Sequence, residues 1–378
     1  MKALHPHVDA DGLREFSVVF TDRSTNHMSQ KFQLAMREIS TKLRAVYNAQ
    51  HIALVPGGGT FAMEAVARQF AGGQDVLTIR NGWFSFRWSQ ILDAGEFHKS
   101  HTVLKARQTH SAQDAPFAPV PIEEAVATIQ VQKPGVVFAP HVETSSGIML
   151  ADDYIARLAE AVHGVGGILV LDCIASGCIW VDMAATGVDV LISAPQKGWS
   201  STPCAGIVMM NDTAYELMQS RDSSSFAANL KTWSNIMKAY EAGGHAYHAT
   251  LPTEGLLALR DAIIEAENIG FPQLKAAQAS LGQRVRQMLA QRGIQSVAAP
   301  GYEAPGVVVS YAAEADIQNG KKFAAIGLQI AAGVPLQCDE PAGFSTFRLG
   351  LFGLDKLTDV DGTVAVLQSA LDAAGLAP

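Results

Sequence analysis

The sequence predicts an α/β protein built on a parallel sheet covered by helices on both faces, followed by a smaller α+β part. Over the first two thirds of the chain, short runs of Val, Ile and Leu end in Gly, Pro, Ser or Asp. Amphipathic stretches follow these runs, as in HIALVPGGG before TFAMEAVARQF. Beyond about residue 255 the pattern changes to long helical periodicity with short strands. Apolar strands separated by helices are typical of the doubly wound class, which binds ligands beyond the carboxyl ends of its strands.

The expected core strands are apolar runs in chain order. They lie at 51–59, 135–147, 166–177, 188–198 and 205–212. Helices are expected in EGLLALRDAIIEAENIG, LKAAQASLGQRVRQMLAQRG and the closing stretch TDVDGTVAVLQSALDAAG, where apolar residues recur at helical spacing. We therefore expect an N-terminal arm at 1–25, a large domain at 26–255 and a small C-terminal domain at 256–378.

The composition argues against several classes of partner. The chain has 378 residues, 48% hydrophobic and 17% charged, enough to fill a sizeable core. Its net charge is −8 and it has no basic cluster, so no nucleic-acid partner is expected. The N-terminus lacks the apolar stretch of a signal peptide, and no run reaches the roughly 18 apolar residues of a membrane helix. The four cysteines form no CxxC pair, so we expect a cytoplasmic protein with reduced thiols and no metal site.

A glycine-rich turn follows the first expected strand. PGGGTFAMEA places three glycines and Thr60 directly before a helix. Exposed N–H groups at a helix start bind phosphate well, but a plain tight turn is the alternative. The turn is not GxGxxG and no acidic residue follows a strand about 20 residues later, so a nicotinamide cofactor is disfavoured.

Two charged residues stand at the ends of later strands. Asp172 ends the run ILVLD, and a buried carboxylate is costly unless it is paired. Lys197 in LISAPQKGWSS follows the next strand, where burial would lower the pKa of its amine and make it nucleophilic. The alternatives are a helix cap or turn residue for Asp172 and a lysine that extends to solvent.

Together these three strand ends are the anchors that pyridoxal phosphate needs. The glycine turn would bind the phosphate, and Lys197 would form a Schiff base with the cofactor. Asp172 would keep the pyridine nitrogen protonated, so that the ring can act as an electron sink. We therefore predict Lys197 and Asp172 as the catalytic residues.

Eight motifs in series carry a family resemblance. They are MSQKFQLAMREI, PGGGTFAMEA, NGWFSFR, HVETSSG, VLDCIAS, SAPQKG, YHATLP and FRLGLFG. With them the sequence resembles the class V aminotransferases of pyridoxal-phosphate fold type I, in particular the alanine–glyoxylate or serine–pyruvate aminotransferase group. The resemblance runs from about residue 28 to the C-terminus. It implies a mainly parallel seven-stranded sheet in the large domain and a smaller C-terminal α+β domain.

The resemblance implies cofactor contacts within one subunit. Gly58, Gly59 and Thr60 would contact the phosphate, and Gln196 would lie near it. It also assigns the Schiff base to Lys197 and the contact with the ring nitrogen to Asp172, in agreement with the strand pattern.

The resemblance also implies contacts to the cofactor ring. Phe84 in NGWFSFR would stack on the ring, with Trp83 as the fallback, and Thr144 in HVETSSG would bond the phenolic oxygen. The alternatives are that Phe84 is ordinary core and that Thr144 caps the next helix.

Three further residues concern the partner subunit and the substrate. In YHATLP, Tyr247 and Thr250 would reach the partner's phosphate, which implies a homodimer with shared active sites; surface residues are the alternative. Arg348 in FRLGLFG would bind the substrate carboxylate as a bidentate fork, since an interior arginine needs an anion.

The predicted function is transamination. An amino group would move from a small amino acid, alanine- or serine-like, to a 2-oxo acid such as glyoxylate or pyruvate, through an aldimine of Lys197. The freed lysine amine would act as general base on the alpha proton, and ping-pong kinetics should follow.

Other functions stay open. A donor such as 2-aminoethylphosphonate or ureidoglycine is possible, and so is a pyridoxal-phosphate lyase of the desulfurase type. Desulfurases carry His before the cofactor lysine where this chain has Gln196, and the candidate nucleophile Cys338 lies in an unsuitable context. A cofactor-binding protein without turnover is a further alternative, which the intact Lys, Asp and Arg set argues against.

The N-terminal region departs from the family pattern. Members open with a GPGP-type segment that lines the substrate pocket, whereas this chain reads FSVVFTDRSTNHMS. Arg23 or Asn26 could therefore enter the pocket and change the choice of donor.

Overall fold

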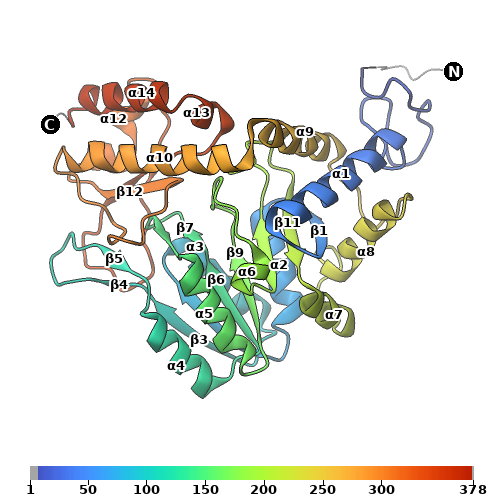
Figure 1. Ribbon diagram of the computed structural model, residues 1–378, viewed down its shortest axis with the longest axis horizontal. Helices are drawn as coiled ribbons and strands as arrows, with labels where there is room; N and C mark the ends of the chain where they lie inside the picture. The colour runs from blue at the N-terminus through green and yellow to red at the C-terminus, as the bar shows by residue number, and fades with distance from the viewer. Residues whose placement is uncertain (1–6, 377–378) are drawn as a thin grey trace.

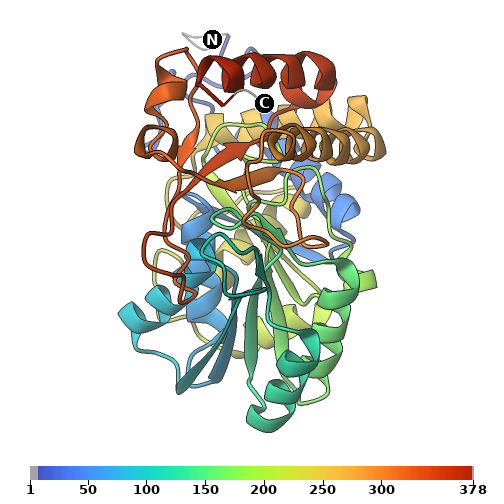
Figure 2. The ribbon, with the colours of Figure 1, turned by 90° about the vertical axis from the view of Figure 1, so that its left-hand side faces the viewer.

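The computed structural model describes residues 7–376 of the chain (Figure 1). Residues 1–6 of the predicted arm and 377–378 of the predicted small domain lie outside the described residues. A large sheet has helices on both faces, and a smaller C-terminal layer lies above the carboxyl ends of its parallel strands (Figures 1 and 2).

The large sheet has seven strands in the order β1-β11-β10-β9-β6-β2-β3. Their bounds are β1 His51–Pro56, β2 Asp75–Arg80, β3 Ser100–Lys105, β6 Val136–Pro140, β9 Ile168–Asp172, β10 Val190–Ser193 and β11 Ala205–Met210. All neighbours are parallel except β11, which is antiparallel to both β1 and β10. This confirms the predicted α/β fold with a mainly parallel seven-stranded sheet.

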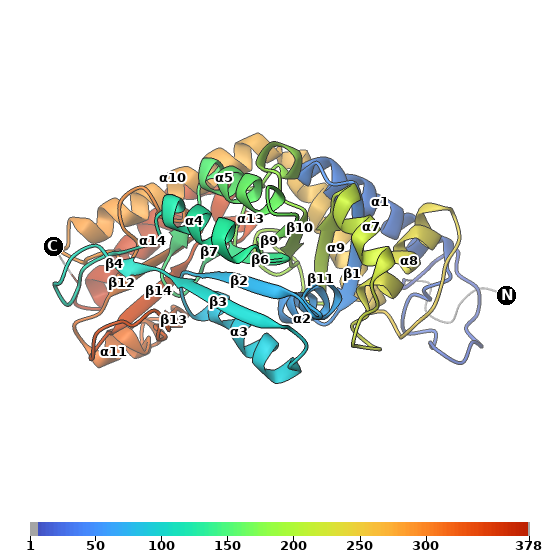
Figure 3. The ribbon, with the colours of Figure 1, turned by 90° about the horizontal axis from the view of Figure 1, so that it is seen from below.

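Helices cover both faces of this sheet. Figure 3 shows α4 and α5 on one face and α2 and α3 on the other. The helices of this part are α1 Gln30–Tyr47, α2 Gly59–Phe70, α3 Trp83–Gly95, α4 Ile122–Gln132, α5 Asp152–His163, α6 Met183–Thr186, α7 Asp212–Ser220 and α8 Leu230–Glu241. Two-residue strands form two small ladders, β4 Arg107–Gln108 with β5 Phe117–Ala118 and β7 Val142–Glu143 with β8 Ile148–Met149.

The C-terminal layer is an antiparallel three-stranded sheet, order β12-β14-β13, with helices around it. Its strands are β12 Val307–Tyr311, β13 Ala331–Ala332 and β14 Thr346–Gly350. Its helices are α9 Thr253–Ile269, α10 Phe271–Ala290, α11 Ala315–Gln318, α12 Lys321–Ala324, α13 Leu354–Thr358 and α14 Val360–Ala373. The predicted boundary after residue 255 falls in the first turn of α9, which continues into α10 along the C-terminal layer (Figure 1).

Burial explains which strands the sequence pattern reveals. Every residue of β9 and β10 is buried, because these central strands are covered on both faces, and both coincide with predicted apolar runs. β2 and β3 are not among those runs. β3 lies at the edge of the sheet, and none of its residues SHTVLK is fully buried, so polar positions interrupt the apolar pattern.

The described part of the N-terminal segment, residues 7–29, contains neither helix nor strand. It lies beside α1, α8 and α9 (Figure 1). Within residues 7–376, no helix combines the length and the apolar character needed to cross a bilayer.

Candidate active site

The predicted catalytic residues lie at the carboxyl ends of two neighbouring parallel strands. Asp172 is the last residue of β9 and pairs in register with Ile192 of β10, and Lys197 stands in the turn that follows β10. The two side chains are close enough for the carboxylate to act on the amine electrostatically. The strand pattern thus brings both residues to one place, as the sequence predicted.

Asp172 is a buried carboxylate, 7% exposed. Its Oδ1 accepts a hydrogen bond from the N–H of Ile174 (2.9 Å), a local turn contact that also agrees with the alternative expectation of a turn residue. Burial raises the pKa of Asp172 to about 6, and the nearby Glu143 adds to this, while the Ile174 N–H and the cations Lys197 and Arg87 act in the opposite direction. A positive group placed against this carboxylate would relieve the cost of its burial.

Lys197 lies between two aromatic rings. Its Nζ is 5.7 Å from the centroid of Phe84 and 5.7 Å from the centroid of Phe352. Burial lowers the pKa of the amine, helped by the cations Arg348 and Arg87 and opposed by the carboxylates. The amine therefore does not extend freely into solvent, and its neutral, nucleophilic form is favoured over that of an ordinary lysine.

The glycine turn forms an open helix start. Gly57 has φ +121°, and Gly58 caps α2 without any side-chain hydrogen bond. The first N–H groups of the helix are therefore not bound by a capping side chain and can donate to a ligand. A Cβ on Gly59 would stand 2.5 Å from Ile174, whereas one on Gly58 would meet nothing within 4 Å. Thr60 is exposed, and its Oγ1 accepts a hydrogen bond from the Arg87 guanidinium (2.8 Å). Donors and a cation surround this space, which suits an anion.

Phe84 is held in place by a buried carboxylate. Glu143 is fully buried and accepts hydrogen bonds from the N–H groups of Phe84 (3.2 Å) and Ser85 (2.8 Å), at the start of α3. It also accepts from the hydroxyl of Ser85 (2.7 Å) and from the N–H (3.1 Å) and hydroxyl (2.8 Å) of Ser145. These five contacts fix the first turn of α3, and with it the Phe84 side chain, against β7.

Three cations surround the Phe84 ring. The guanidinium carbon of Arg87 is 5.2 Å from its centroid, Lys197 Nζ is 5.7 Å away and the Arg348 guanidinium carbon is 5.7 Å away. The ring of Trp83, the fallback for the stacking residue, instead contacts Phe86 at 5.8 Å. Phe84 is thus the aromatic side chain of NGWFSFR that faces the lysine.

Arg348 lies on the central strand of the C-terminal sheet and points to the same place. Its Nε donates to the carbonyl of Ala332 (2.8 Å) and one terminal nitrogen to the carbonyl of Thr144 (3.5 Å). Among residues 7–376 no carboxylate forms an ion pair with it, although burial lowers the pKa of the guanidinium. Thr144, 6% exposed, has a buried Oγ1 without a hydrogen-bond partner in the described chain.

The other predicted cofactor contacts are exposed or lie elsewhere. Gln196, next to the lysine, is exposed. The hydroxyls of Tyr247 and Thr250 lie 3.3 Å apart, and Tyr247 is 54% exposed with its ring 5.5 Å from that of His27. Within the described residues no hydrogen bond joins either of these two to the lysine turn or the glycine turn. The sequence predicts that they act in the partner's site.

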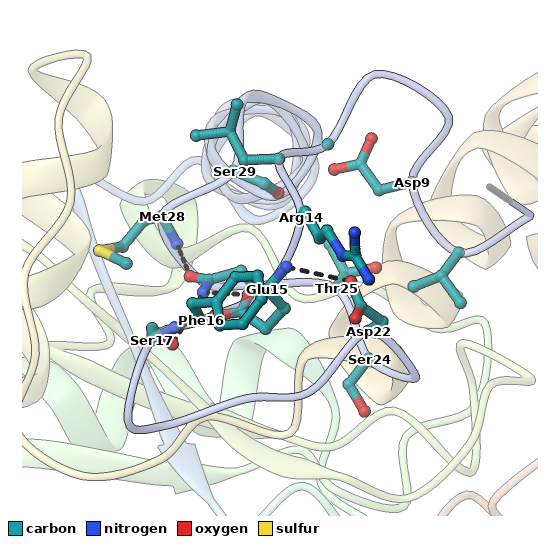
Figure 4. Close-up of a pocket in the computed structure, with 14 residues that line it drawn as sticks. Asp9, Arg14, Glu15, Phe16, Ser17, Asp22, Ser24, Thr25, Met28 and Ser29 are labelled. Carbon is teal, nitrogen blue, oxygen red and sulfur yellow. Dashed lines mark hydrogen bonds between the residues drawn. The ribbon is translucent and has the colours of Figure 1, made fainter. Parts of the chain in front are cut away.

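Arg23 and Asn26 do not reach the lysine within one chain. Arg23 is exposed, and the amide of Asn26 donates to Glu15 (2.7 Å) inside the N-terminal segment. This segment surrounds a cavity of its own, about 300 Å³, lined by residues between Val8 and Ser29 (Figure 4). The cavity contains none of the predicted catalytic residues.

Cys338, the candidate nucleophile of the lyase alternative, is buried. Its Sγ lies 3.4 Å from the carbonyl oxygen of Arg80, and burial raises the pKa of the thiol to about 12. A thiol in this state is a poor nucleophile.

Sequence reasoning did not assign four residues that the structure brings to the site. They are Arg87, Glu143, Ile174 and Phe352. Each lies inside a motif already singled out, respectively NGWFSFR, HVETSSG, VLDCIAS and FRLGLFG. Their position in these motifs was the available signal, but each contact depends on a partner distant in the chain or on the shape of a turn.

A family model, two similar sequences and a similar solved structure, all of aminotransferases, match this chain. The family model described as Aminotransferase class-V matches residues 13–341. The chain is 28% identical over 341 residues to 2-aminoethylphosphonate–pyruvate transaminase 2 of Paraburkholderia xenovorans (strain LB400), covering 88% of this chain and 86% of that protein. It is 26% identical over 247 residues to alanine–glyoxylate aminotransferase of Rattus norvegicus, covering 64% of this chain and 56% of the rat protein. The crystal structure of alanine–glyoxylate aminotransferase from Nostoc sp. shares the fold, with a TM-score of 0.74 at 21% identity over 92% of this chain and 89% of that chain.

Proposed function

The chain belongs to the class-V aminotransferases, and from this premise we propose that it is a pyridoxal-phosphate-dependent transaminase of small substrates. It would move the amino group of an alanine- or serine-like amino acid to a 2-oxo acid such as glyoxylate or pyruvate. The observation that carries the proposal is the convergence of Lys197, Asp172 and Arg348 around the Phe84 ring. An amine, a buried carboxylate and an unpaired guanidinium together can bind a cofactor and an amino acid.

The polar groups of the site fit pyridoxal phosphate. The open helix start at Gly58 has amide donors for a phosphate, and Thr144 Oγ1 lacks a partner that a phenolic oxygen would supply. Asp172 has no cation within hydrogen-bonding distance in the described chain, and a pyridinium nitrogen would supply one. When bound, the cofactor supplies an electron sink for the charge that develops at the substrate's alpha carbon.

Lys197 would perform two tasks with one atom. Its Nζ would hold the cofactor covalently between turnovers, and once displaced it would take and return the alpha proton of the substrate. The lowered pKa of the amine favours both tasks, because each requires the unprotonated form. The rings of Phe84 and Phe352 would exclude water from this atom.

Arg348 would orient the substrate by its carboxylate. A guanidinium binds a carboxylate through two parallel hydrogen bonds, and Arg348 has no ion pair to break first in the described chain. Arg87, the other guanidinium near the Phe84 ring, is engaged with Thr60 at the helix start. One free guanidinium supports a donor with a single carboxylate and an uncharged side chain.

We also propose a cytoplasmic homodimer, with the division into arm, large domain and small domain expected from the sequence. The phosphate side of the site supports the dimer, because Thr60 is exposed and Phe61 beside it is 59% exposed. Tyr247 and Thr250 of a partner subunit would cover this side and donate to the phosphate. The four cysteines, all free, support a reducing compartment.

A second candidate donor is 2-aminoethylphosphonate. The relative of this name matches 88% of the chain, more than the 64% matched by the rat alanine–glyoxylate enzyme. Such a donor has no carboxylate on the carbon that bears the amine, so Arg348 would have to bind its phosphonate. A lyase has less support, because the thiol of Cys338 is buried and its pKa is raised.

The test is a half-reaction screen of the cofactor-loaded protein. Alanine, serine, aspartate and 2-aminoethylphosphonate are each added without an acceptor, and the absorbance of the lysine-bound cofactor is followed. We expect alanine or serine to discharge it, and glyoxylate or pyruvate to restore it. Discharge by 2-aminoethylphosphonate alone would select the second candidate, whereas release of ammonia without discharge would contradict both.

A further inference from the structure

Phe352 leaves the C-terminal sheet directly toward the reactive lysine. It follows β14, and the alternation of burial along the strand continues to residue 352, so that Arg348, Gly350 and Phe352 lie on the less buried side of the chain. Phe347, Leu349 and Leu351 on the opposite side are buried in the core. The side that carries Arg348 therefore also carries the Phe352 ring, and both contact the surroundings of Lys197.

The Phe352 ring lies against bare backbone. A Cβ added to Gly306 would stand 3.2 Å from the ring, one on Gly350 3.6 Å and one on Gly177 3.7 Å. A Cβ at Gly306 would be tighter than an ordinary contact, so a larger residue there would displace the Phe352 ring. Three glycines from separate parts of the chain thus leave the space in which this ring lies.

Hydrogen bonds fix the backbone on both sides of Phe352. The N–H of Leu351 donates to the carbonyl of Gly306 (2.9 Å). The N–H of Leu354 donates to Ser200 Oγ (3.2 Å), and the N–H of Ser200 donates to the Lys197 carbonyl (3.0 Å), so the segment is attached to the lysine turn itself. The backbone segments that carry the Phe352 ring and the lysine are therefore joined by the fold.

We propose that Phe352 forms one wall of the pocket for the donor's side chain and restricts the enzyme to donors with short side chains. The inference rests on the proposed transaminase function. A donor must bring its nitrogen to the place of Lys197 Nζ and its carboxylate to Arg348. The remaining substituent of its alpha carbon then lies within reach of a ring whose centroid is 5.7 Å from Nζ. A fixed ring at that distance accepts hydrogen, methyl or hydroxymethyl and excludes longer chains.

The kinetic test compares donors of increasing length. Alanine, 2-aminobutyrate and norvaline are assayed with the wild type, Phe352→Ala and Phe352→Leu. We expect the ratio of kcat/KM for norvaline to that for alanine to rise about tenfold or more in Phe352→Ala, and by less in Phe352→Leu, which preserves more of the packing. The control is Phe344→Ala, an aromatic residue of the same layer that contacts Phe117 and Tyr311 instead.

A second readout does not depend on turnover. The full-length chain freed of cofactor is treated with formaldehyde or with butyraldehyde, each with borohydride, and adducts at Lys197 are measured by peptide mass spectrometry. The ratio of butyl to methyl adducts should rise in Phe352→Ala and stay at the wild-type value in Phe344→Ala. Unchanged adduct and donor ratios in a folded Phe352→Ala protein would overturn the proposal. If no amine discharges the lysine-bound cofactor of the wild type, the proposed transaminase function is wrong. The adduct ratio then still tests whether Phe352 limits access to Lys197.

Discussion

The two sides of the site differ in how completely one chain builds them. On the side of β9, β10 and α3, Asp172 and Glu143 are buried, and Glu143 makes five hydrogen bonds. On the side of the glycine turn, Thr60 and Phe61 are exposed, and the hydroxyls of Tyr247 and Thr250, predicted to bind a partner's phosphate, contact each other. The first side, called the closed side below, is buried within one chain. The second, called the open side below, is exposed to solvent in one chain. Substitutions on the two sides should therefore have different consequences.

The largest expected effect is on the closed side, at Lys197. Lys197→Ala removes both the covalent attachment and the proton-transfer group, so activity should fall by at least about 10³-fold. Borohydride reduction should trap no cofactor on the variant, as measured by mass spectrometry. Lys231→Ala, whose ammonium donates to the carbonyl of Gln219, is the control and should trap cofactor normally. A trapped adduct in Lys197→Ala would refute the assignment.

The next effect concerns the buried carboxylate that holds α3. Glu143→Ala leaves the N–H groups of Phe84, Ser85 and Ser145 without their acceptor, which should lower the free energy of unfolding by about 4 kcal/mol. Chemical denaturation measures this loss. Glu123→Ala is the matched control, because its pair with Arg157 is exposed to solvent and should contribute little to stability. Equal losses in both variants would show that the closed side is no more tightly built than the surface.

The pH dependence of stability tests the buried charge of Asp172. Its pKa in the folded cofactor-free chain, about 6, lies above the ordinary value of 3.8. Between these two pH values the folded state therefore holds a proton that the unfolded state has released. This carboxyl group is therefore favourable to folding below about pH 4, and that contribution is lost as the pH rises to about 6. Relative to wild type, Asp172→Asn should become more stable between pH 4 and pH 7, by at most about 3 kcal/mol. Denaturation of both proteins at the two pH values measures the difference, and a difference independent of pH would contradict a raised pKa.

The smallest expected effect is on the open side. Tyr247→Phe removes one hydroxyl, which should weaken binding of pyridoxal phosphate by about tenfold or less and leave the fold intact. Fluorescence titration at protein concentrations above and below dimer dissociation, found by ultracentrifugation, measures the affinity. Tyr215→Phe, whose ring stacks on His51, is the control and should bind as the wild type does. An equal effect of Tyr247→Phe in the monomer and the dimer would argue against a contact across subunits.

The sequence alone was sufficient for the closed side where chain order determines position. Asp172 and Lys197 follow consecutive apolar strands, and because parallel neighbours end at the same edge, their proximity followed from the pattern. The contacts of Glu143 with α3 could not be predicted in this way, because they join residues nearly sixty positions apart through backbone amides. Phe352 was not assigned from FRLGLFG, because its surroundings include Gly177 and Gly306, which are distant in the chain. Strand β3 was missed because an edge strand carries polar residues.

The placement of Arg348 on β14 and of Phe352 two residues beyond its end has a consequence for how this protein could change. The groups expected to perform the reaction belong to the ends of β9 and β10, whereas those expected to select the substrate belong to a segment of five residues in another layer. Exchange of that short segment between homologues would alter which amine is accepted without disturbing the reaction chemistry. Substrate specificity in proteins of this fold can therefore change through substitutions at a few neighbouring positions.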